Sequence, residues 1–219
     1  MSNSFTTVEN NLFERVDGEI EIISSKSGEN IYRYNTFRES EGTLTLRHGN
    51  DNLVEGNFFL GLGQNNSGAV RVIGERQTVV NNFIQAVDDR ADGAISISAG
   101  VPNPALNEYY QVKDAVIAHN TIVATLGTMI TFDHGLGSSG RTQLAENVTI
   151  DNNLFFSSGP TIFEGTEGTG WSWAGNIAWG GNLGPKAGVP SSEINVVNPQ
   201  MQFDASSGLW RLTSTGPAI

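Results

Sequence analysis

The chain of 219 residues contains no cysteine, which excludes disulfide bonds and thiol catalysis. Proline is scarce, with 7 residues against 26 glycines, so the composition is neither collagen-like nor of low complexity. No apolar run approaches the roughly 20 residues that cross a bilayer, so we expect a soluble chain without membrane contact. The N-terminal segment lacks the basic and apolar stretches of a secretion signal.

Basic residues are also few: 12 Lys and Arg stand against 23 Asp and Glu, for a formal net charge of -11. Such a surface repels nucleic acid, which argues against a DNA or RNA partner. It also repels acidic glycans, so an acidic ligand needs a local basic patch. One candidate patch groups Lys26, Arg33, Arg38, Arg47, Arg71 and Arg76. Chance clustering accounts for this grouping equally well.

A short motif, Asn followed by any residue and an apolar residue, recurs along the chain. It begins at Asn11, Asn35, Asn57, Asn81, Asn120, Asn153 and Asn176. A period in the low twenties with occasional longer spacings indicates a solenoid whose insertions emerge as loops. Because asparagine tolerates the left-handed backbone conformation and bonds nearby backbone groups, we expect these residues to shape turns.

Runs of alternating apolar and polar residues lie between the asparagines, at 19–22, 43–46, 70–72 and 94–98. Alternation of period two indicates strands with one buried face, and no long stretch has helical periodicity. We therefore predict an all-β, right-handed parallel β-helix with coils of about 22–25 residues, as a single domain over 1–219. Ile22, Leu46 and Val70 recur at one constant spacing, which predicts one inward apolar ladder.

Two carboxylates, Glu19 and Glu21, should point outward on one strand while Ile20 and Ile22 point inward. Neighbouring carboxylates repel each other unless a cation lies between them, and such oxygen-rich pairs suit Ca²⁺. A solvated acidic strand explains the same pattern.

Three cations follow on successive coils. Lys26 lies in the turn after the Glu19–Ile22 strand. Arg47 and Arg71 are separated by the same spacing as the apolar ladder, which predicts that they stack about 4.8 Å apart. Stacked like charges repel each other, and an anion bound between them would relieve the repulsion. Two arginines that splay into solvent are the alternative.

Together these residues meet the demands of β-elimination from a 4-linked uronic acid. A cation neutralises the uronate carboxylate, a base removes the neighbouring C5 proton, and a donor assists the leaving oxygen. A lysine beside arginine and metal can act as that base. Arginine is a poor acid, so it would donate together with water or stabilise the leaving oxygen.

Hydrolytic chemistry has less support. A glycosidase needs two opposed carboxylates, for which the candidates are Asp88, Asp89, Asp92 and Asp133. The three histidines lack metal-ligand spacing, and no Gly-x-Ser-x-Gly elbow is present.

At these positions the chain resembles polysaccharide lyase family 6, which contains alginate lyases and chondroitinase B. The resemblance rests on Glu19-Ile20-Glu21, Ser25-Lys26-Ser27, Arg47-His48-Gly49-Asn50 and Val70-Arg71-Val72, and it continues through Tyr110-Gln111-Val112-Lys113 to the segment 214–219. It implies a parallel β-helix and the cleavage of acidic polysaccharide, most of the family preferring alginate.

The resemblance also implies residue roles: Lys26 as general base, Arg47 as general acid, Glu19 and Glu21 as Ca²⁺ ligands, and Arg71 and His48 as substrate-binding residues. It implies a secreted or periplasmic location. The family's calcium site also uses an asparagine well before the first glutamate, at a position that would precede Met1 of this sequence. The family's early coils and N-terminal cap are likewise absent, so we expect a fragment or a truncated form.

Two further functions stay open. A chondroitin or dermatan sulfate lyase would need more arginine for sulfate than this chain obviously supplies. A β-helix that binds acidic glycans without cleaving them would keep the shape and the basic stripe. The loops between Phe83 and Asn153 carry Tyr109, Tyr110 and His134, for which the sequence favours no role over that of ordinary surface residues.

Overall fold

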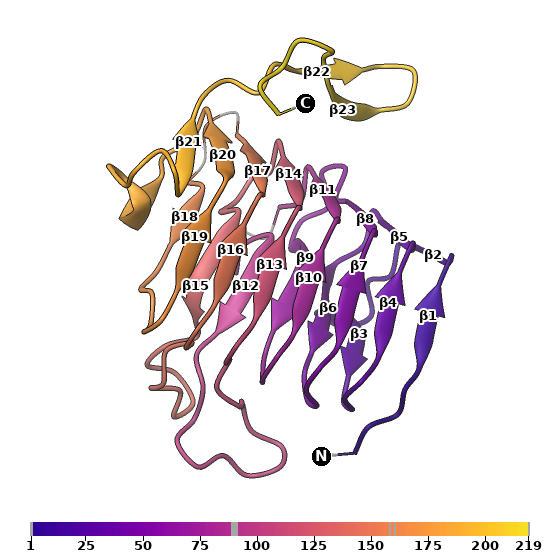
Figure 1. Ribbon diagram of the computed structural model, residues 1–219. Coiled ribbons are helices and arrows are strands. Elements are labelled where there is room, and N and C mark those ends of the chain that lie inside the picture. Colours follow the sequence, from indigo (N-terminus) through magenta and orange to yellow (C-terminus); the bar gives the residue numbers. More distant parts are fainter. Residues whose placement is uncertain (1, 89–91, 158, 160, 219) are drawn as a thin grey trace.

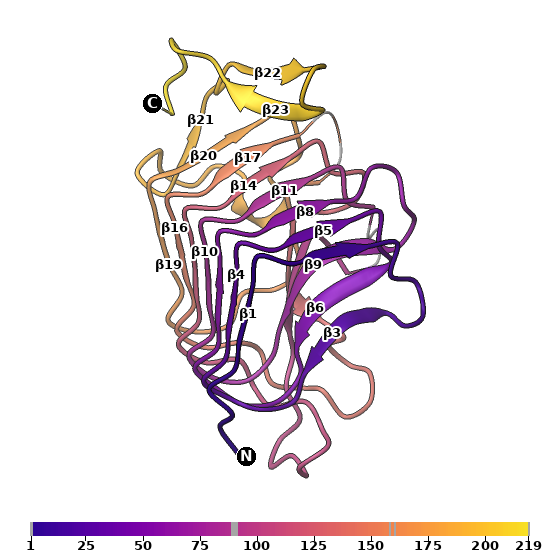
Figure 2. The ribbon, with the colours of Figure 1, turned by 90° about the vertical axis from the view of Figure 1, so that its right-hand side faces the viewer.

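The computed structural model describes residues 2–88, 92–157, 159 and 161–218, and it shows a stack of parallel strands (Figure 1). A complete coil contributes one strand to each of three sheets, and the described residues form seven, eight and six strands in these sheets. Viewed from the side in Figure 2, successive coils superimpose and the three sheets form the sides of the cross-section. The predicted parallel β-helix is confirmed.

The strands follow one another in regular order. The first sheet consists of β1 (Thr7–Glu9), β4 (Ile31–Arg33), β7 (Leu53–Glu55), β10 (Thr78–Val80), β13 (Val116–Ala118), β16 (Thr149–Asp151) and β19 (Ser172–Ala174). The second consists of β2 (Leu12–Glu14), β5 (Thr36–Arg38), β8 (Phe58–Leu60), β11 (Phe83–Gln85), β14 (Thr121–Val123), β17 (Leu154–Phe156), β20 (Asn176–Trp179) and β21 (Ile194–Val196). The third consists of β3 (Glu21–Ser25), β6 (Gly42–Leu46), β9 (Ser67–Val72), β12 (Ile95–Ser98), β15 (Ile130–His134) and β18 (Phe163–Glu164).

The core consists of apolar side chains at matching strand positions. In the second sheet Phe13 pairs with Phe37 and Phe37 with Phe59, and their rings stack with centroids 4.8 and 4.7 Å apart. In the first sheet Val54 and Val79 are paired and fully buried. The middle residue of each short strand therefore points inward, as alternation requires.

A ladder of asparagine amides runs along one corner of the stack. The backbone N–H and side-chain amide of Asn35 both donate to Oδ1 of Asn57, over 3.0 and 3.1 Å. Asn57 donates in the same way to Asn82, with both bonds at 2.9 Å. The pattern links Asn11, Asn35, Asn57, Asn82, Asn120, Asn153 and Asn176. Buried amides on successive coils are thus satisfied by one another.

Two details of the predicted repeat are wrong. The ladder residue of the fourth coil is Asn82 rather than Asn81, because Phe58 pairs with Phe83. The left-handed backbone belongs to the residue before each ladder asparagine, such as Asn10, Asn81 and Asn152, with φ of 58°, 56° and 54°. The ladder asparagines are selected for their side-chain amides rather than for their backbone conformation.

The predicted register of the third sheet is also wrong, although its strands form. The segments 43–46 and 94–98 lie largely within β6 and β12, and 70–72 ends β9. The first strand begins at Glu21 rather than at Glu19, and its register shifts between Glu21 and Ile23. This irregularity places Ile23 opposite Leu44, which in turn faces Val70. The inward ladder is therefore not Ile22, Leu46 and Val70.

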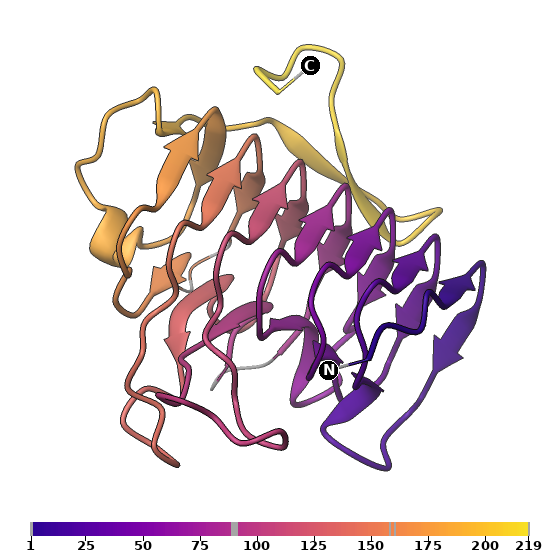
Figure 3. The same ribbon diagram turned by 60° about the horizontal axis from the view of Figure 1, so that its bottom comes forward.

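The chain ends in an antiparallel hairpin, β22 (Met201–Asp204) and β23 (Leu209–Leu212), which is not a coil (Figure 3). It attaches to the second sheet through Gln85, whose side chain donates to the Gly208 carbonyl and accepts from the Trp210 N–H. Within the described ranges the helical element is a 3-10 turn, η1 (Gly184–Lys186). That part of the chain contains no helix long and apolar enough to cross a membrane.

The amide ladder predicts a large effect of Asn57→Ala. Its side chain accepts two bonds from Asn35 and donates to Asn82 and to the Tyr32 and Glu55 carbonyls. Removing it leaves buried groups unpaired, so we expect a loss of roughly 2–4 kcal/mol in the free energy of unfolding, measured in urea. Asn11→Ala, at the exposed end of the ladder, is the control and should cost clearly less. Equal losses would contradict this role of the ladder.

Candidate functional site

An open groove of about 430 Å³ lies along the first coils of the third sheet. It is lined by Glu19, Ile20, Glu21, Ser24, Lys26, Arg47, Arg71 and Tyr109. Five of the six residues predicted for the site therefore line one groove. The sixth, His48, follows Arg47 directly.

Lys26 and Arg47 lie at equivalent places on neighbouring coils. Ser25 pairs with Leu46 at the ends of β3 and β6, and Lys26 and Arg47 follow these two residues. The His48 N–H donates to the Ser25 carbonyl over 2.9 Å, which continues the pairing past the strands. A Cβ on Gly49 would overlap backbone atoms of the preceding coil, so only glycine permits this approach. The two predicted catalytic residues are thereby brought together.

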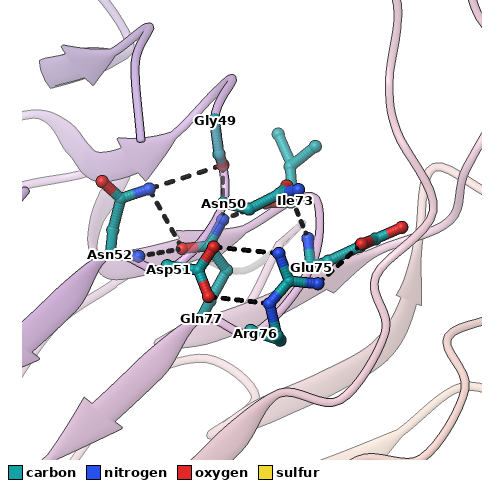
Figure 4. Close-up of polar contacts among 8 residues, drawn as sticks. All are labelled: Gly49, Asn50, Asp51, Asn52, Ile73, Glu75, Arg76 and Gln77. Carbon is teal, nitrogen blue, oxygen red and sulfur yellow. Dashed lines mark hydrogen bonds and ion pairs between the residues drawn. The ribbon is translucent and has the colours of Figure 1, made fainter. Parts of the chain in front are cut away.

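The turn after His48 is fixed by a second set of amides (Figure 4). The backbone N–H and side-chain amide of Asn52 both donate to Oε1 of Gln77 over 3.1 Å. The Gln77 amide donates to the carbonyls of Gly49 and Ile73, at 2.8 and 2.9 Å. These bonds fix the backbone that presents Arg47 and His48.

Arg71 does not stack on Arg47, contrary to the prediction. The register places Arg71 opposite Thr45, two residues before Arg47. Arg71 is only 5% exposed and forms an ion pair with Asp92, whose other oxygen lies 2.9 Å from Nδ1 of His134. Burial raises the pKa of Asp92, but the His134 hydrogen bond and the charges of His134 and Arg71 outweigh it, so this pKa is lowered. Arg71 is therefore a neutralised cation.

The predicted basic patch separates into two groups. Lys26, Arg47 and Arg71 line the groove. The other three arginines form ion pairs elsewhere: Arg33 with Glu9, Arg38 with Glu14, and Arg76 with Asp51 and Glu75. Lys26 and Arg47 form no ion pair with any residue that the structure describes, so their charges are available to a ligand.

Glu19 and Glu21 both line the groove, but not as two outward positions of one strand. Glu19 lies before β3, and Ile20 between them is 56% exposed rather than inward. Among the described residues neither carboxylate has an ion-pair or hydrogen-bond partner, and in that part of the chain no three His, Cys, Asp or Glu side chains lie close enough together to hold a metal ion. Carboxylate oxygens are the ligands that hard cations take, so Glu19 and Glu21 are groove residues with suitable donor atoms.

His48, which follows Arg47 in the chain, is partly buried. Burial, followed by the charges of Arg47 and Lys26, lowers the pKa of His48, while Glu21 acts in the opposite direction. Its Nδ1 is buried without a hydrogen-bond partner among the described residues, and its ring meets Tyr110 edge-on at 6.5 Å. His48 is therefore a neutral imidazole at neutral pH.

Tyr109, Asp92 and Arg141 belong to this site although no sequence pattern marks them. Tyr109 reaches the groove from the loop between β12 and β13, and its ring contacts the guanidinium groups of Arg47 and Arg141. Of the glycosidase candidates, Asp92 pairs with Arg71, and Asp133 accepts the Thr166 N–H. Asp88 is buried and does not line the groove, and Asp89 lies outside the described residues.

The His48 pKa predicts a pH effect on stability. Because the folded state lowers this pKa, the unfolded chain takes up the proton first as pH falls below about 6.5. The free energy of unfolding therefore falls with pH in this range and levels off once pH is below the folded pKa of His48. We expect wild type to lose more free energy of unfolding between neutral and mildly acidic pH than His48→Gln does, as measured in urea. His119→Gln, at an exposed turn outside the groove, is the matched control. Equal losses in wild type and His48→Gln would contradict the argument.

Comparison with solved structures identifies proteins of similar fold. An alginate lyase of the PL6 family, AlyGC, is 35% identical over 98% of this chain and 29% of its own chain, with a TM-score of 0.81. A mannuronic acid specific family 6 lyase from human gut microbiota is 30% identical over 81% of this chain and 41% of its own, with a TM-score of 0.69. A PL6 alginate lyase in complex with a trisaccharide shares the fold at 22% identity and a TM-score of 0.80.

This chain spans 29%, 41% and 50% of the lengths of those three structures. No curated protein matches it. The family model described as Chondroitinase B matches residues 1–169, well over half of the chain. The chain therefore belongs to the chondroitinase B family, polysaccharide lyase family 6.

Proposed function

We propose that this chain carries the catalytic groove of a lyase that cleaves alginate, a 4-linked uronic-acid polysaccharide, by β-elimination. One observation carries the proposal: Lys26 and Arg47 lie on neighbouring coils, in one groove, without ion-pair partners among the described residues. An amine and an uncompensated guanidinium side by side suit proton removal and stabilisation of negative charge. Family membership and the alginate lyases of similar structure support the same reaction.

In the proposed reaction the uncharged amine of Lys26 accepts the C5 proton of the uronate and becomes an ammonium. The electron pair of the C–H bond forms the C4–C5 double bond, and the bond from C4 to the glycosidic oxygen breaks. Arg47 lies against that oxygen and stabilises its negative charge while a proton arrives from the guanidinium or from water. Arg71 and His48 bind the sugar, His48 as a neutral imidazole.

Glu19 and Glu21 are the residues that would hold Ca²⁺ in this groove. When bound, the ion neutralises the uronate carboxylate and makes the C5 proton more acidic. The two carboxylates line the same groove as Lys26 and Arg47, so the groove carries charges of both signs without the ion.

The family description gives a second candidate substrate, a sulfated polysaccharide such as dermatan or chondroitin sulfate. The described lining offers three cations, and Asp92 already neutralises one of them. Because Lys26 accepts a proton only as an uncharged amine, Arg47 is then the unpaired cation of this lining, which suits a polymer with one carboxylate per sugar better than one that also carries sulfate. Alginate is therefore the first substrate to test.

Lys26→Ala tests the base. Wild type mixed with alginate should produce the ultraviolet absorbance of an unsaturated uronate, and the variant should lower kcat by about 10²- to 10⁴-fold. Lys113→Ala, which removes a lysine paired with Glu146 outside the groove, should match wild type. New reducing ends without absorbance would indicate a hydrolase. Alginate binding without cleavage would indicate a binding protein, and absorbance only with dermatan sulfate would favour the second substrate.

Glu19→Gln and Glu21→Gln test the metal. If the two carboxylates hold Ca²⁺, calcium should raise the thermal unfolding midpoint of wild type, and each variant should reduce or abolish that rise. Chelator should lower lyase activity in parallel. Glu29→Gln, an exposed glutamate outside the groove, serves as the control of equal charge change. An equal calcium effect in all four proteins would place the ion elsewhere.

A further inference from the structure

The Arg47 guanidinium is held by an aromatic ring rather than by a carboxylate. Its carbon lies 4.0 Å from the centroid of the Tyr109 ring. Arg47 forms no ion pair and no side-chain hydrogen bond with any residue in the described ranges. Arg71 in the same groove presents the opposite arrangement, since Asp92 pairs with it.

A second arginine contacts the same ring. The Arg141 guanidinium carbon lies 4.4 Å from the Tyr109 centroid. Arg141 is only 8% exposed, and its Nε and Nη2 donate to the carbonyl and hydroxyl of Ser138, at 3.2 and 2.9 Å. It has no carboxylate partner among the described residues. A buried cation of this kind is costly unless other groups stabilise it, and the electron-rich face of Tyr109 is one such group.

The loops that carry Tyr109 and Arg141 are joined to each other. The Tyr109 carbonyl accepts the Val101 N–H over 2.8 Å, and Gly100 forms an isolated antiparallel bridge with Gln143. The Gln111 side chain donates to the Leu144 carbonyl over 2.7 Å. These bonds join two loops that emerge from different coils, and they hold the backbone at Tyr109 and at residues before and after it in the sequence.

Arg141 also packs on the backbone of Gly135. A Cβ at Gly135, where φ is 76°, would overlap the Arg141 guanidinium. The guanidinium packs directly on this backbone, so it has little room to move away from Tyr109.

We infer that Tyr109 and Arg141 are positioning residues for the reaction: Arg141 fixes the Tyr109 ring, and the ring fixes the Arg47 guanidinium at the groove. The inference rests on the proposed function of Arg47. A ring holds a guanidinium through its π face and leaves every N–H donor and the full charge available. A carboxylate would fix the group equally well but would neutralise the charge that the leaving oxygen requires.

Comparison of Tyr109→Leu with Tyr109→Phe tests this arrangement. Loss of the ring should lower kcat on alginate by about tenfold or more, because misplacement of a reacting group by about 1 Å is sufficient for such a loss. KM should stay within about twofold, since Arg71 and the carboxylates are untouched. Tyr109→Phe keeps the face of the ring and should restore kcat. Arg141→Met should also lower kcat, because it removes the group that holds the Tyr109 ring.

Two controls separate positioning from folding. Thermal unfolding midpoints establish that the variants are folded, and Tyr34→Leu removes a matched Tyr–Arg contact (5.6 Å to Arg33) outside the groove. In an Arg47→Lys background, Tyr109→Leu should cost much less than in wild type, because both changes act through one group.

An active wild type with unchanged kcat in Tyr109→Leu would overturn the inference alone. Equal losses in Tyr109→Leu and Tyr109→Phe would also overturn it, because the hydroxyl rather than the ring would then be responsible. A wild type that forms no unsaturated product would overturn the proposed function and, with it, the catalytic role of this contact.

Discussion

The structure depends on the requirement that every coil stack in register on the next. The paired amides of the asparagine ladder impose it, because each accepts two hydrogen bonds from one coil and donates to another. Apolar residues at the strand centres then superimpose and exclude water. The same register brings the ends of β3 and β6 together, so that Lys26 and Arg47 become neighbours although a full coil of sequence separates them. The geometry of the proposed catalytic pair is a consequence of coil stacking.

Within the groove, cations of the same type are held in two ways. Arg71 is nearly buried and neutralised by Asp92, which in turn contacts His134. Arg47 is half-buried, contacts an aromatic ring and keeps its charge. The first arrangement favours a fixed donor of hydrogen bonds with little net field, and the second favours a strong local positive potential. Glu19 and Glu21 line the same groove, so the site combines carboxylates with cations.

The sequence predicted the fold, and five of the six residues predicted for the site line one groove, but their alignment was not predicted. The Asn motif identified the repeat because each coil needs one amide at its corner. Alternation then located the strands, except at Glu19–Ile22, where the register shift before Ile23 breaks the period of two. Counting a constant repeat therefore aligned Arg47 with Arg71, whereas the extra residues between β8 and β9 place Thr45 there. The roles of Tyr109, Asp92 and Arg141 could not be predicted, since their contacts join loops from different coils and leave no local pattern.

The proposed catalytic pair and the residues that hold Arg47 differ in how freely evolution can alter the segments that carry them. Lys26 and Arg47 belong to turns that follow paired strands, where an inserted residue would shift every contact of the coil. Tyr109 and Arg141 lie on long connections, between β12 and β13 and between β15 and β16, which the stack accommodates outside its coils. Connections of this kind can lengthen, shorten or exchange without disturbing the register. The positions of Lys26 and Arg47 are thus tied to the stacked coils. The loops that carry Tyr109 and Arg141 can change independently, so selection for other polysaccharides can act on them.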